Sequence, residues 1–312
     1  MKLVVTLLLA VALSPAPAGG TSFDGVYANG WGARHYHGYV PSTYRPGTPL
    51  PLLVALPGCT ETGAAFERLT GLSALAERRG FIVVYPEQSV LANPSLCWNW
   101  FLDANQVRGS GEPSLIAGIT AAVRARYTVD PRRIFITGGS AGGVMAVVMT
   151  VTYPDVFAAA GVVAGCEYRC DVLRLRSPDE AGDLAYRAMG PRARPVPVMV
   201  FQGSADPVVP PETAARVVGQ WAQTDDLALN GTDDGDMDAV PDRVETGRAP
   251  GGRGFVHSVY ASAAGTVLVE EYLVDGAGHA WPGGCGCDPF GDPAGPDAST
   301  LQWDFFAAHP AP

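Results

Sequence analysis

The sequence predicts an α/β protein with a mostly parallel central sheet that helices cover on both faces. Two observations lead to this fold class. Short apolar runs alternate with segments of helical periodicity along the chain. The apolar runs are also uninterrupted, and such runs are typical of strands that are buried on both faces, as in parallel sheets.

The expected strands, in chain order, are Leu50–Leu56, Phe81–Tyr85, Arg133–Thr137, Phe157–Ala164, Val196–Gln202 and Thr266–Val274. The expected helices are Leu69–Arg79, Glu112–Tyr127, Gly142–Tyr153 and Pro211–Gln223. In the second helix, Ile116, Ile119 and Val123 share one face. Pro211 suits a first helical turn. We expect a single domain over residues 22–309, with its ligand site beyond the carboxyl ends of the strands.

One segment, Thr224–Gly252, breaks this alternation and is rich in Asp, Gly and Pro. We expect a solvated loop there. Four of its carboxylates, clustered within six residues, leave a calcium site open as an alternative, because hard cations take clustered oxygen ligands. They are Asp233, Asp234, Asp236 and Asp238.

The first 18 residues have the pattern of an export signal. Lys2 precedes an apolar run, Leu3–Leu13, and Ala16-Pro17-Ala18 matches a small-residue cleavage site. The run is short for a membrane span. The sequence therefore predicts a secreted protein, extracellular or periplasmic, without a membrane anchor after cleavage. An uncleaved anchor is the alternative.

Composition and charge exclude some classes of function. Hydrophobic residues make up 47% of the chain and charged residues 17%, which predicts a globular protein. The formal net charge of −10 and the absence of a basic patch argue against nucleic-acid binding. We expect a monomer that uses no cofactor and no metal.

The strongest motif is Gly138-Gly139-Ser140-Ala141-Gly142, which follows the predicted strand Arg133–Thr137 and opens an apolar helix. In this context G-x-S-x-G is the nucleophile turn of the α/β-hydrolase fold, where a strained backbone exposes the serine hydroxyl above the sheet. The amino terminus of the helix also favours negative charge near Ser140. Ser140 is thus the predicted nucleophile.

A serine nucleophile needs a base, and the base needs an orienting acid. Of five histidines, only His279 lies on a loop directly after the last predicted strand. Asp206 follows the strand Val196–Gln202, at a carboxyl end where loops carry function. The chain order Ser140, Asp206, His279 is the order of this fold. A turn aspartate before Pro207 is the alternative for Asp206.

Acyl transfer also needs donors that face the developing oxyanion. One expected donor is the backbone amide of Ala141, directly after the nucleophile. The other comes from the loop after Leu50–Leu56, where we assign the amide of Cys59.

Four segments together resemble the polyhydroxybutyrate depolymerase family of esterases, which includes feruloyl and acetylxylan esterase relatives. They are Leu56-Pro57-Gly58-Cys59-Thr60, Cys97-Trp98-Asn99-Trp100-Phe101, the Ser140 motif, and Gly278-His279-Ala280-Trp281-Pro282-Gly283-Gly284. The resemblance covers nearly the whole mature chain and implies the same three catalytic residues, the Cys59 donor and a Cys59–Cys97 disulfide. Two residues depart from the family pattern: Pro57 replaces a histidine, and Glu61 stands where glutamine is common.

Trp98 and Trp281 are expected to wall the acyl pocket, since aromatic faces suit apolar ester chains. Core packing is the alternative for Trp98.

Cys166, Cys170, Cys285 and Cys287 remain, and an even count in an exported chain predicts disulfides. A bridge within Cys285-Gly286-Cys287 would be strained. We therefore expect two cross-bridges that tie the His279 loop to the loop after Phe157–Ala164. A tetrathiolate zinc site is the alternative.

These features predict a secreted serine esterase. A short-chain polyester or its oligomers is the first expected substrate, and a feruloyl or acetyl ester of the plant cell wall is the second. A non-catalytic binding protein on the same scaffold is the alternative of another class.

Overall fold

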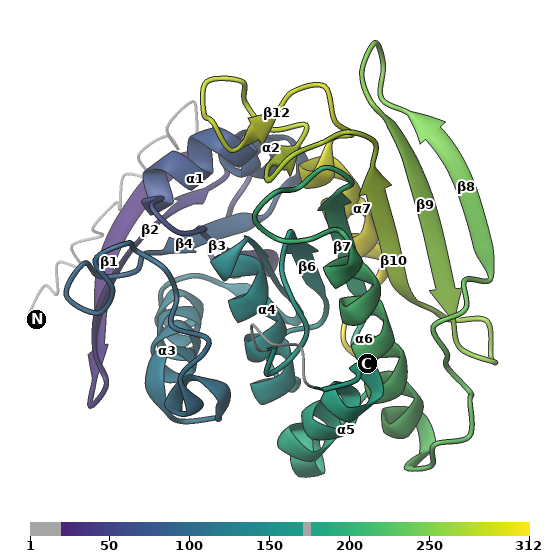
Figure 1. Cartoon of the computed structure of the whole chain (residues 1–312). Helices are drawn as coiled ribbons and strands as arrows, with labels where there is room; N and C mark the ends of the chain where they lie inside the picture. The colour runs from purple at the N-terminus through teal and green to yellow at the C-terminus, as the bar shows by residue number, and fades with distance from the viewer. Residues whose placement is uncertain (1–19, 171–175) are drawn as a thin grey trace, which may run out of the picture.

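A ten-stranded sheet runs through the molecule, and helices lie against both of its faces (Figure 1). The computed structural model describes residues 20–170 and 176–312, so the predicted export signal lies outside the described residues. The strand order is β1-β2-β4-β3-β5-β6-β7-β10-β9-β8. The six strands from β4 to β10 in this order are parallel, and the strands outside them pair antiparallel.

The strands of this sheet are β1 (Thr21–Asn29), β2 (Gly32–Val40), β3 (Leu50–Leu56), β4 (Ile82–Pro86), β5 (Val129–Gly139), β6 (Ala160–Val163), β7 (Val198–Gly203), β8 (Arg243–Arg248), β9 (Gly254–Ala261) and β10 (Val267–Val274). A separate small pair consists of β11 (Trp281–Pro282) and β12 (Gly291–Asp292). The α-helices are α1 (Gly63–Thr70), α2 (Leu72–Arg79), α3 (Gly111–Arg126), α4 (Ala141–Thr152), α5 (Pro178–Met189), α6 (Glu212–Asn230) and α7 (Ala298–Ala308). Two short 3-10 helices are η1 (Asp103–Gln106) and η2 (Gly190–Arg192).

The apolar strands supply two cores, one on each face of the sheet. In β3, Leu52, Val54 and Leu56 join a core that includes side chains of α3, α4, α5 and α6. Leu53 and Ala55 point the opposite way, into a core with side chains of α1, α2 and α7. Because successive strand residues alternate between faces, an uninterrupted apolar run is what two-sided burial requires. The predicted fold class is confirmed.

All six predicted strands are present; Leu50–Leu56 matches β3 at both ends, and no boundary differs by more than four residues. The predicted helix Leu69–Arg79 is wrong at its start, because the segment forms two helices that meet at Gly71. Gly71 has φ 63°, a left-handed conformation that glycine adopts readily and that ends α1. Thr62 caps the start of α1, with Oγ1 accepting a hydrogen bond from the Ala65 amide at 3.2 Å.

The expected loop Thr224–Gly252 is also wrong at both ends. Helix α6 continues to Asn230, and β8 lies inside the segment and pairs with β9, which follows it. Buried Asp226 organises the turn between them, accepting hydrogen bonds from the amides of Asp234, Gly235 and Met237. Across residues 20–170 and 176–312, no group of three or more His, Cys, Asp or Glu side chains is arranged to hold a metal ion.

In the same described ranges, no helix has the length and apolar character needed to cross a membrane.

Candidate active site

The predicted site residues meet at one edge of the sheet because parallel strands end there together. Ser140 follows β5, Asp206 follows β7 and His279 follows β10. Ser140 and His279 line one cavity of about 210 Å³, together with the loop after β3. The complete lining is Gly58, Cys59, Thr60, Glu61, Phe66, Leu69, Gly139, Ser140, Val163, Ala164, Val208, His279, Ala280, Trp281 and Phe290.

Ser140 occupies the strained turn that the motif predicts. Its backbone has φ 53° and ψ −122°, between the end of β5 and the start of α4. The Ser140 amide donates to the Val163 carbonyl at 2.8 Å, which anchors the turn to β6. A Cβ on Gly142 would lie 2.1 Å from the Leu56 carbonyl oxygen, and one on Gly138 would lie 2.3 Å from the Gly142 backbone. Both glycines are therefore required by close backbone approach.

Asp206 and His279 form a direct pair. Nδ1 of His279 lies 2.8 Å from Oδ2 of Asp206, and the aspartate side chain is fully buried. The other aspartate oxygen accepts from the amides of Val208 at 2.8 Å and Val209 at 2.9 Å, and Gln202 donates to Oδ2 at 3.1 Å. These bonds fix the carboxylate and hence the imidazole ring.

The electrostatics favour an ionised Asp206. Burial raises the pKa of its carboxyl, but the hydrogen bonds from His279, Val209 and Val208 outweigh burial and hold the pKa below its ordinary value. An ionised aspartate accepts a hydrogen bond from Nδ1–H of His279, so the proton stays on Nδ1 and Nε2 is free to act as a base.

The two backbone amides that the sequence predicts as oxyanion donors belong to Ala141 and Cys59. Ala141 is the first residue of α4, so its amide has no acceptor within the helix. Cys59 lines the cavity, and its amide donates to no acceptor in residues 20–170 and 176–312. The neighbouring Thr60, at φ 67°, donates to the Ser95 carbonyl at 2.7 Å and holds the loop in place.

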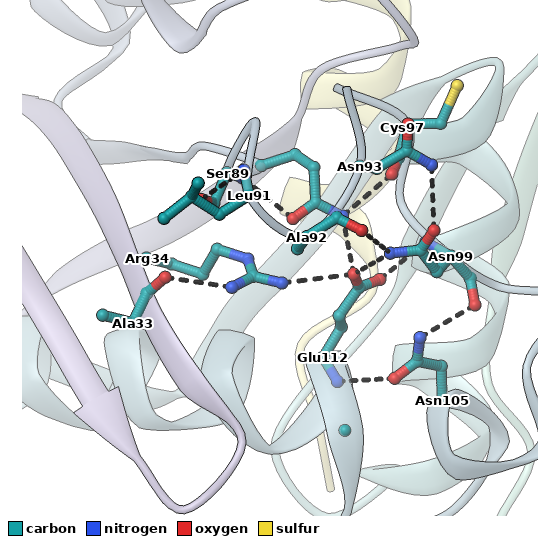
Figure 2. A network of polar contacts seen from close by, with 12 residues as sticks. Ala33, Arg34, Ser89, Leu91, Ala92, Asn93, Cys97, Asn99, Asn105 and Glu112 are labelled. Atoms are coloured by element: carbon teal, nitrogen blue, oxygen red, sulfur yellow. Dashed lines mark hydrogen bonds and ion pairs between the residues drawn. The ribbon is translucent and has the colours of Figure 1, made fainter. Parts of the chain in front are cut away.

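The Cys59–Cys97 disulfide is confirmed, and it ties this loop to the segment that precedes α3. A buried polar network around Glu112 then fixes that segment (Figure 2). Glu112 accepts from the Asn99 amide and side chain, both at 2.7 Å, and from Arg34 at 3.2 Å. Gln88 bridges Glu112 to the Cys97 carbonyl.

This network lies outside the cavity and supports the loop after β3, residues 57–62, which carries Cys59 and is called the oxyanion loop below. Asn105 closes the ring of contacts, accepting from the Glu112 amide at 2.8 Å and donating to the Asn99 carbonyl at 2.8 Å (Figure 2). Arg34 and Glu112 are both buried, so the ion pair has little screening from water. The sequence pointed to the cysteine pair through the resemblance but carried no signal for Arg34, 65 positions before Asn99 in the chain.

The two predicted pocket tryptophans have different environments. Trp281 lines the cavity as predicted and packs edge-on against Phe66, with ring centroids 5.3 Å apart. Trp98 is wrong as a substrate contact, because its side chain is fully buried in the core. Its indole N–H donates to the Pro57 carbonyl at 3.2 Å, so Trp98 supports the oxyanion loop from the core side.

Sequence reasoning missed most of the apolar wall. Phe66 and Leu69 come from α1, whereas Val208 and Phe290 come from the loops after Asp206 and His279. The only available signal was position: each of these loops follows a strand that ends at the ligand edge. Glu61 is the one carboxylate among the cavity residues, and the sequence marks it only as a departure from a family pattern.

The expected cross-bridges are also wrong, and so is the zinc alternative. The structure pairs Cys166 with Cys170 and Cys285 with Cys287. The first pair lies beside Glu167, which binds Arg216 of α6, whereas the Cys285 amide donates to Leu69 of α1. Because α6 and α1 cover opposite faces of the sheet, each cysteine pair closes within its own loop.

Sequence comparisons find relatives of this chain among known proteins. Residues 35–239 match the family described as esterase PHB depolymerase. The chain is 38% identical over 244 residues to poly(3-hydroxyalkanoate) depolymerase C from Paucimonas lemoignei, covering 74% of this chain and 55% of that protein. It is 31% identical over 257 residues to an acetylxylan esterase from Coprinopsis cinerea, covering 76% of this chain and 62% of that one. The chain thus spans less than two thirds of the length of either relative.

Among solved structures, an acetyl xylan esterase from Aspergillus awamori superposes with a TM-score of 0.63. The sequences are 23% identical, and the match covers 79% of this chain and 89% of that one. At this identity the likeness shows the fold alone, and it confirms the predicted α/β-hydrolase fold. The match to the family over residues 35–239, together with the 38% identical relative, shows that this chain belongs to the esterase PHB depolymerase family.

Proposed function

We propose that this chain is a secreted serine esterase that hydrolyses carboxylic esters through an acyl-enzyme. Ser140 is the nucleophile, His279 the general base and Asp206 the acid that orients it. The amides of Cys59 and Ala141 stabilise the oxyanion. The observation that carries the proposal is the 2.8 Å contact between His279 and Asp206 beside a cavity that Ser140 and His279 share.

In the first half-reaction, His279 Nε2 takes the hydroxyl proton while Ser140 Oγ attacks the ester carbonyl carbon. Asp206 stabilises the imidazolium that forms. The carbonyl oxygen gains negative charge and accepts hydrogen bonds from Cys59 and Ala141. When the tetrahedral intermediate collapses, the carbon–oxygen bond to the alcohol breaks, and His279 returns its proton to the leaving alcohol.

In the second half-reaction, water replaces the alcohol. His279 removes a proton from the water, and the resulting hydroxide attacks the acyl carbon. The bond to Ser140 Oγ then breaks, the serine recovers its proton from His279, and the carboxylic acid leaves. The starting state of the three side chains is restored.

The Ser140→Ala variant tests this assignment directly. We expect kcat for a short-chain ester to fall by several orders of magnitude, since the acyl-enzyme cannot form. A fluorophosphonate probe should label the wild-type chain at Ser140 and leave the variant unlabelled. Wild-type protein that resists the probe and hydrolyses no ester would favour the non-catalytic binding protein. Full esterase activity in Ser140→Ala would exclude this nucleophile.

We propose a short-chain hydroxyalkanoate polyester or its oligomers as the substrate. A cavity of about 210 Å³ with an aromatic and aliphatic wall suits a small apolar acyl unit. The relative with the higher identity is a poly(3-hydroxyalkanoate) depolymerase, which favours the same substrate class. The acetylxylan esterase relative supports a cell-wall acetyl ester as the second candidate.

A direct competition distinguishes these substrates. We expect a higher kcat/KM on 3-hydroxybutyrate oligomers than on acetylated xylan or methyl ferulate, measured by acid release at one pH. Higher kcat/KM on either cell-wall ester would reverse the order of the candidates. The Ser140→Ala variant is the matched control in each assay.

Secretion is the remaining part of the proposal. All six cysteines are paired, and stable disulfides are typical of oxidising compartments. The export signal predicted over residues 1–18 gives the route. Expression of the full chain should yield a mature protein outside the cytoplasm that begins near Gly19, as read by N-terminal sequencing.

A further inference from the structure

Glu61 is a buried carboxyl group in the wall of the cavity, and the mechanism above does not use it. Glu61 is 7% exposed and lies two positions after Cys59 on the oxyanion loop. Oε2 accepts a hydrogen bond from the Gly58 amide at 2.9 Å. Oε1 is buried and has no hydrogen-bond partner in residues 20–170 and 176–312.

The carboxyl group and the nucleophile are both neighbours of Gly58. A Cβ built on Gly58 would lie 2.9 Å from Glu61 Oε2 and 3.4 Å from the Cβ of Ser140. The Gly58–Glu61 hydrogen bond therefore fixes the backbone directly before the Cys59 amide and beside the nucleophile. A negative charge at this place would oppose the negative charge of the oxyanion.

We propose that Glu61 is a positioning residue that holds the oxyanion loop and works in its neutral form. In that form Oε2 keeps the Gly58 amide in place, Oε1 carries the proton, and the loop adds no negative charge beside the oxyanion. This inference rests on the proposed function, because it concerns the transition state of ester hydrolysis.

The surroundings of Glu61 favour the neutral form below about pH 7. Burial raises the pKa of the carboxyl to about 7, against the lowering effect of the Gly58 amide. Two charged groups on other loops also act on it. Asp288, before β12, raises the pKa, and His279, after β10, lowers it with a smaller effect.

The test compares kcat and KM between pH 5 and pH 9.5 for the wild type and Glu61→Gln. The substrate is a short-chain aliphatic ester. The released acid is titrated directly, so that ionisation of the leaving group does not affect the measured pH dependence. Wild-type kcat should fall roughly tenfold on the alkaline side as Glu61 ionises. In Glu61→Gln the amide oxygen takes the Gly58 hydrogen bond and no charge forms, so kcat should persist to high pH with KM nearly unchanged.

Three further variants separate charge from structure. Glu61→Ala removes the partner of the Gly58 amide and should lower kcat at every pH. Glu67→Gln, on α1 and outside the cavity, makes the same charge change and should keep the wild-type profile. Asp288→Asn should move the alkaline fall to lower pH, and this holds even if Glu61→Gln does not fold.

An alkaline fall in Glu61→Gln that matches the wild type would overturn the inference, as would a wild type without such a fall. An Asp288→Asn profile that does not move would also contradict it. These outcomes leave the proposed function standing provided that Ser140→Ala is inactive. An active Ser140→Ala variant would remove the proposed function as well.

Discussion

Two buried carboxyl groups of the site, Asp206 and Glu61, have opposite electrostatics for a reason visible in their contacts. Asp206 accepts hydrogen bonds from His279 and from two backbone amides, and these outweigh the cost of burial. Glu61 accepts a hydrogen bond from one backbone amide, so burial is the larger effect and raises its pKa. The number of donors that reach each carboxyl thus decides which of the two keeps its proton to the higher pH.

Replacing Asp206 by asparagine should preserve the fold and remove most of the activity. An asparagine amide cannot stabilise the imidazolium and favours the wrong tautomer of His279, so kcat should fall by about 10⁴. Steady-state kinetics on a short-chain ester, with circular dichroism to verify folding, would measure this. A loss of less than tenfold would show that Asp206 is the ordinary turn residue that precedes Pro207.

Glu61 should also make the stability of the protein depend on pH. Its pKa is about 7 in the folded protein against 4.5 for the free group, so the folded state holds the proton more tightly. The stabilisation is fully present below pH 4.5 and is lost as the pH rises through 7. Between pH 4.5 and pH 8 the wild type should therefore lose about 3 kcal/mol of unfolding free energy that Glu61→Gln keeps. Urea unfolding at both pH values would measure the difference, and parallel behaviour would contradict the assigned burial effect.

At the scale of the element, the start of α3 holds the site together from outside the cavity. Glu112, in the first turn of this helix, connects Arg34 of β2 with the segment that carries Cys97 and Asn99 (Figure 2). A helix amino terminus favours a carboxylate, and burial strengthens each of these hydrogen bonds. The oxyanion loop depends on this helix through the Cys59–Cys97 bridge.

Glu112→Gln should destabilise the protein strongly, because it leaves Arg34 charged and buried without its counterion. Removing one partner of a buried ion pair costs about 3–5 kcal/mol. Thermal and urea unfolding would measure the loss. Glu245→Gln, on the exposed strand β8, is the control and should change stability by less than about 0.5 kcal/mol. A Glu112→Gln variant as stable as this control would mean that the network contributes packing alone.

At the scale of the whole molecule, the two cores on either side of the sheet place the loops of the site at one edge. Leu56, Gly139 and Val163 end neighbouring parallel strands, and their loops converge around Ser140. The Cys59–Cys97 bridge adds a covalent connection between the loop after β3 and the long β4–α3 connection, across 38 residues. The sheet brings the loops to one edge. The disulfide then restricts loops that the hydrogen bonds of the sheet do not reach.

Replacing both Cys59 and Cys97 by serine should lower the free energy of unfolding by roughly 2–4 kcal/mol, because the unfolded chain regains the freedom of a 38-residue loop. The activity should fall as well, mainly in kcat, since the Cys59 amide loses its fixed position. Unfolding and kinetics of the double variant would test both effects. Unchanged kcat would show that the Glu112 network alone positions the oxyanion loop.

Sequence by itself determined the layer order and the position of the reactive turn. Uninterrupted apolar runs specify strands buried on both faces, so β3, β5, β7 and β10 could be predicted with their ends near Pro57, Ser140, Asp206 and His279. A parallel sheet brings those ends to one edge. The half-exposed strands β1 and β2 escaped prediction because they lack such runs, and α5 escaped although Ser177 and Glu180 form a capping box at its start.

Only the tertiary structure decided which partners meet from different layers. Cys166 and Cys285 do not pair because α6 and α1 hold their loops on opposite faces of the sheet. Trp98 lies in the core and Glu61 lines the cavity. The burial of these side chains depends on the packing of distant segments and not on the local sequence pattern. Local pattern specifies where a strand ends, whereas burial and pairing depend on residues that only the folded chain brings into contact.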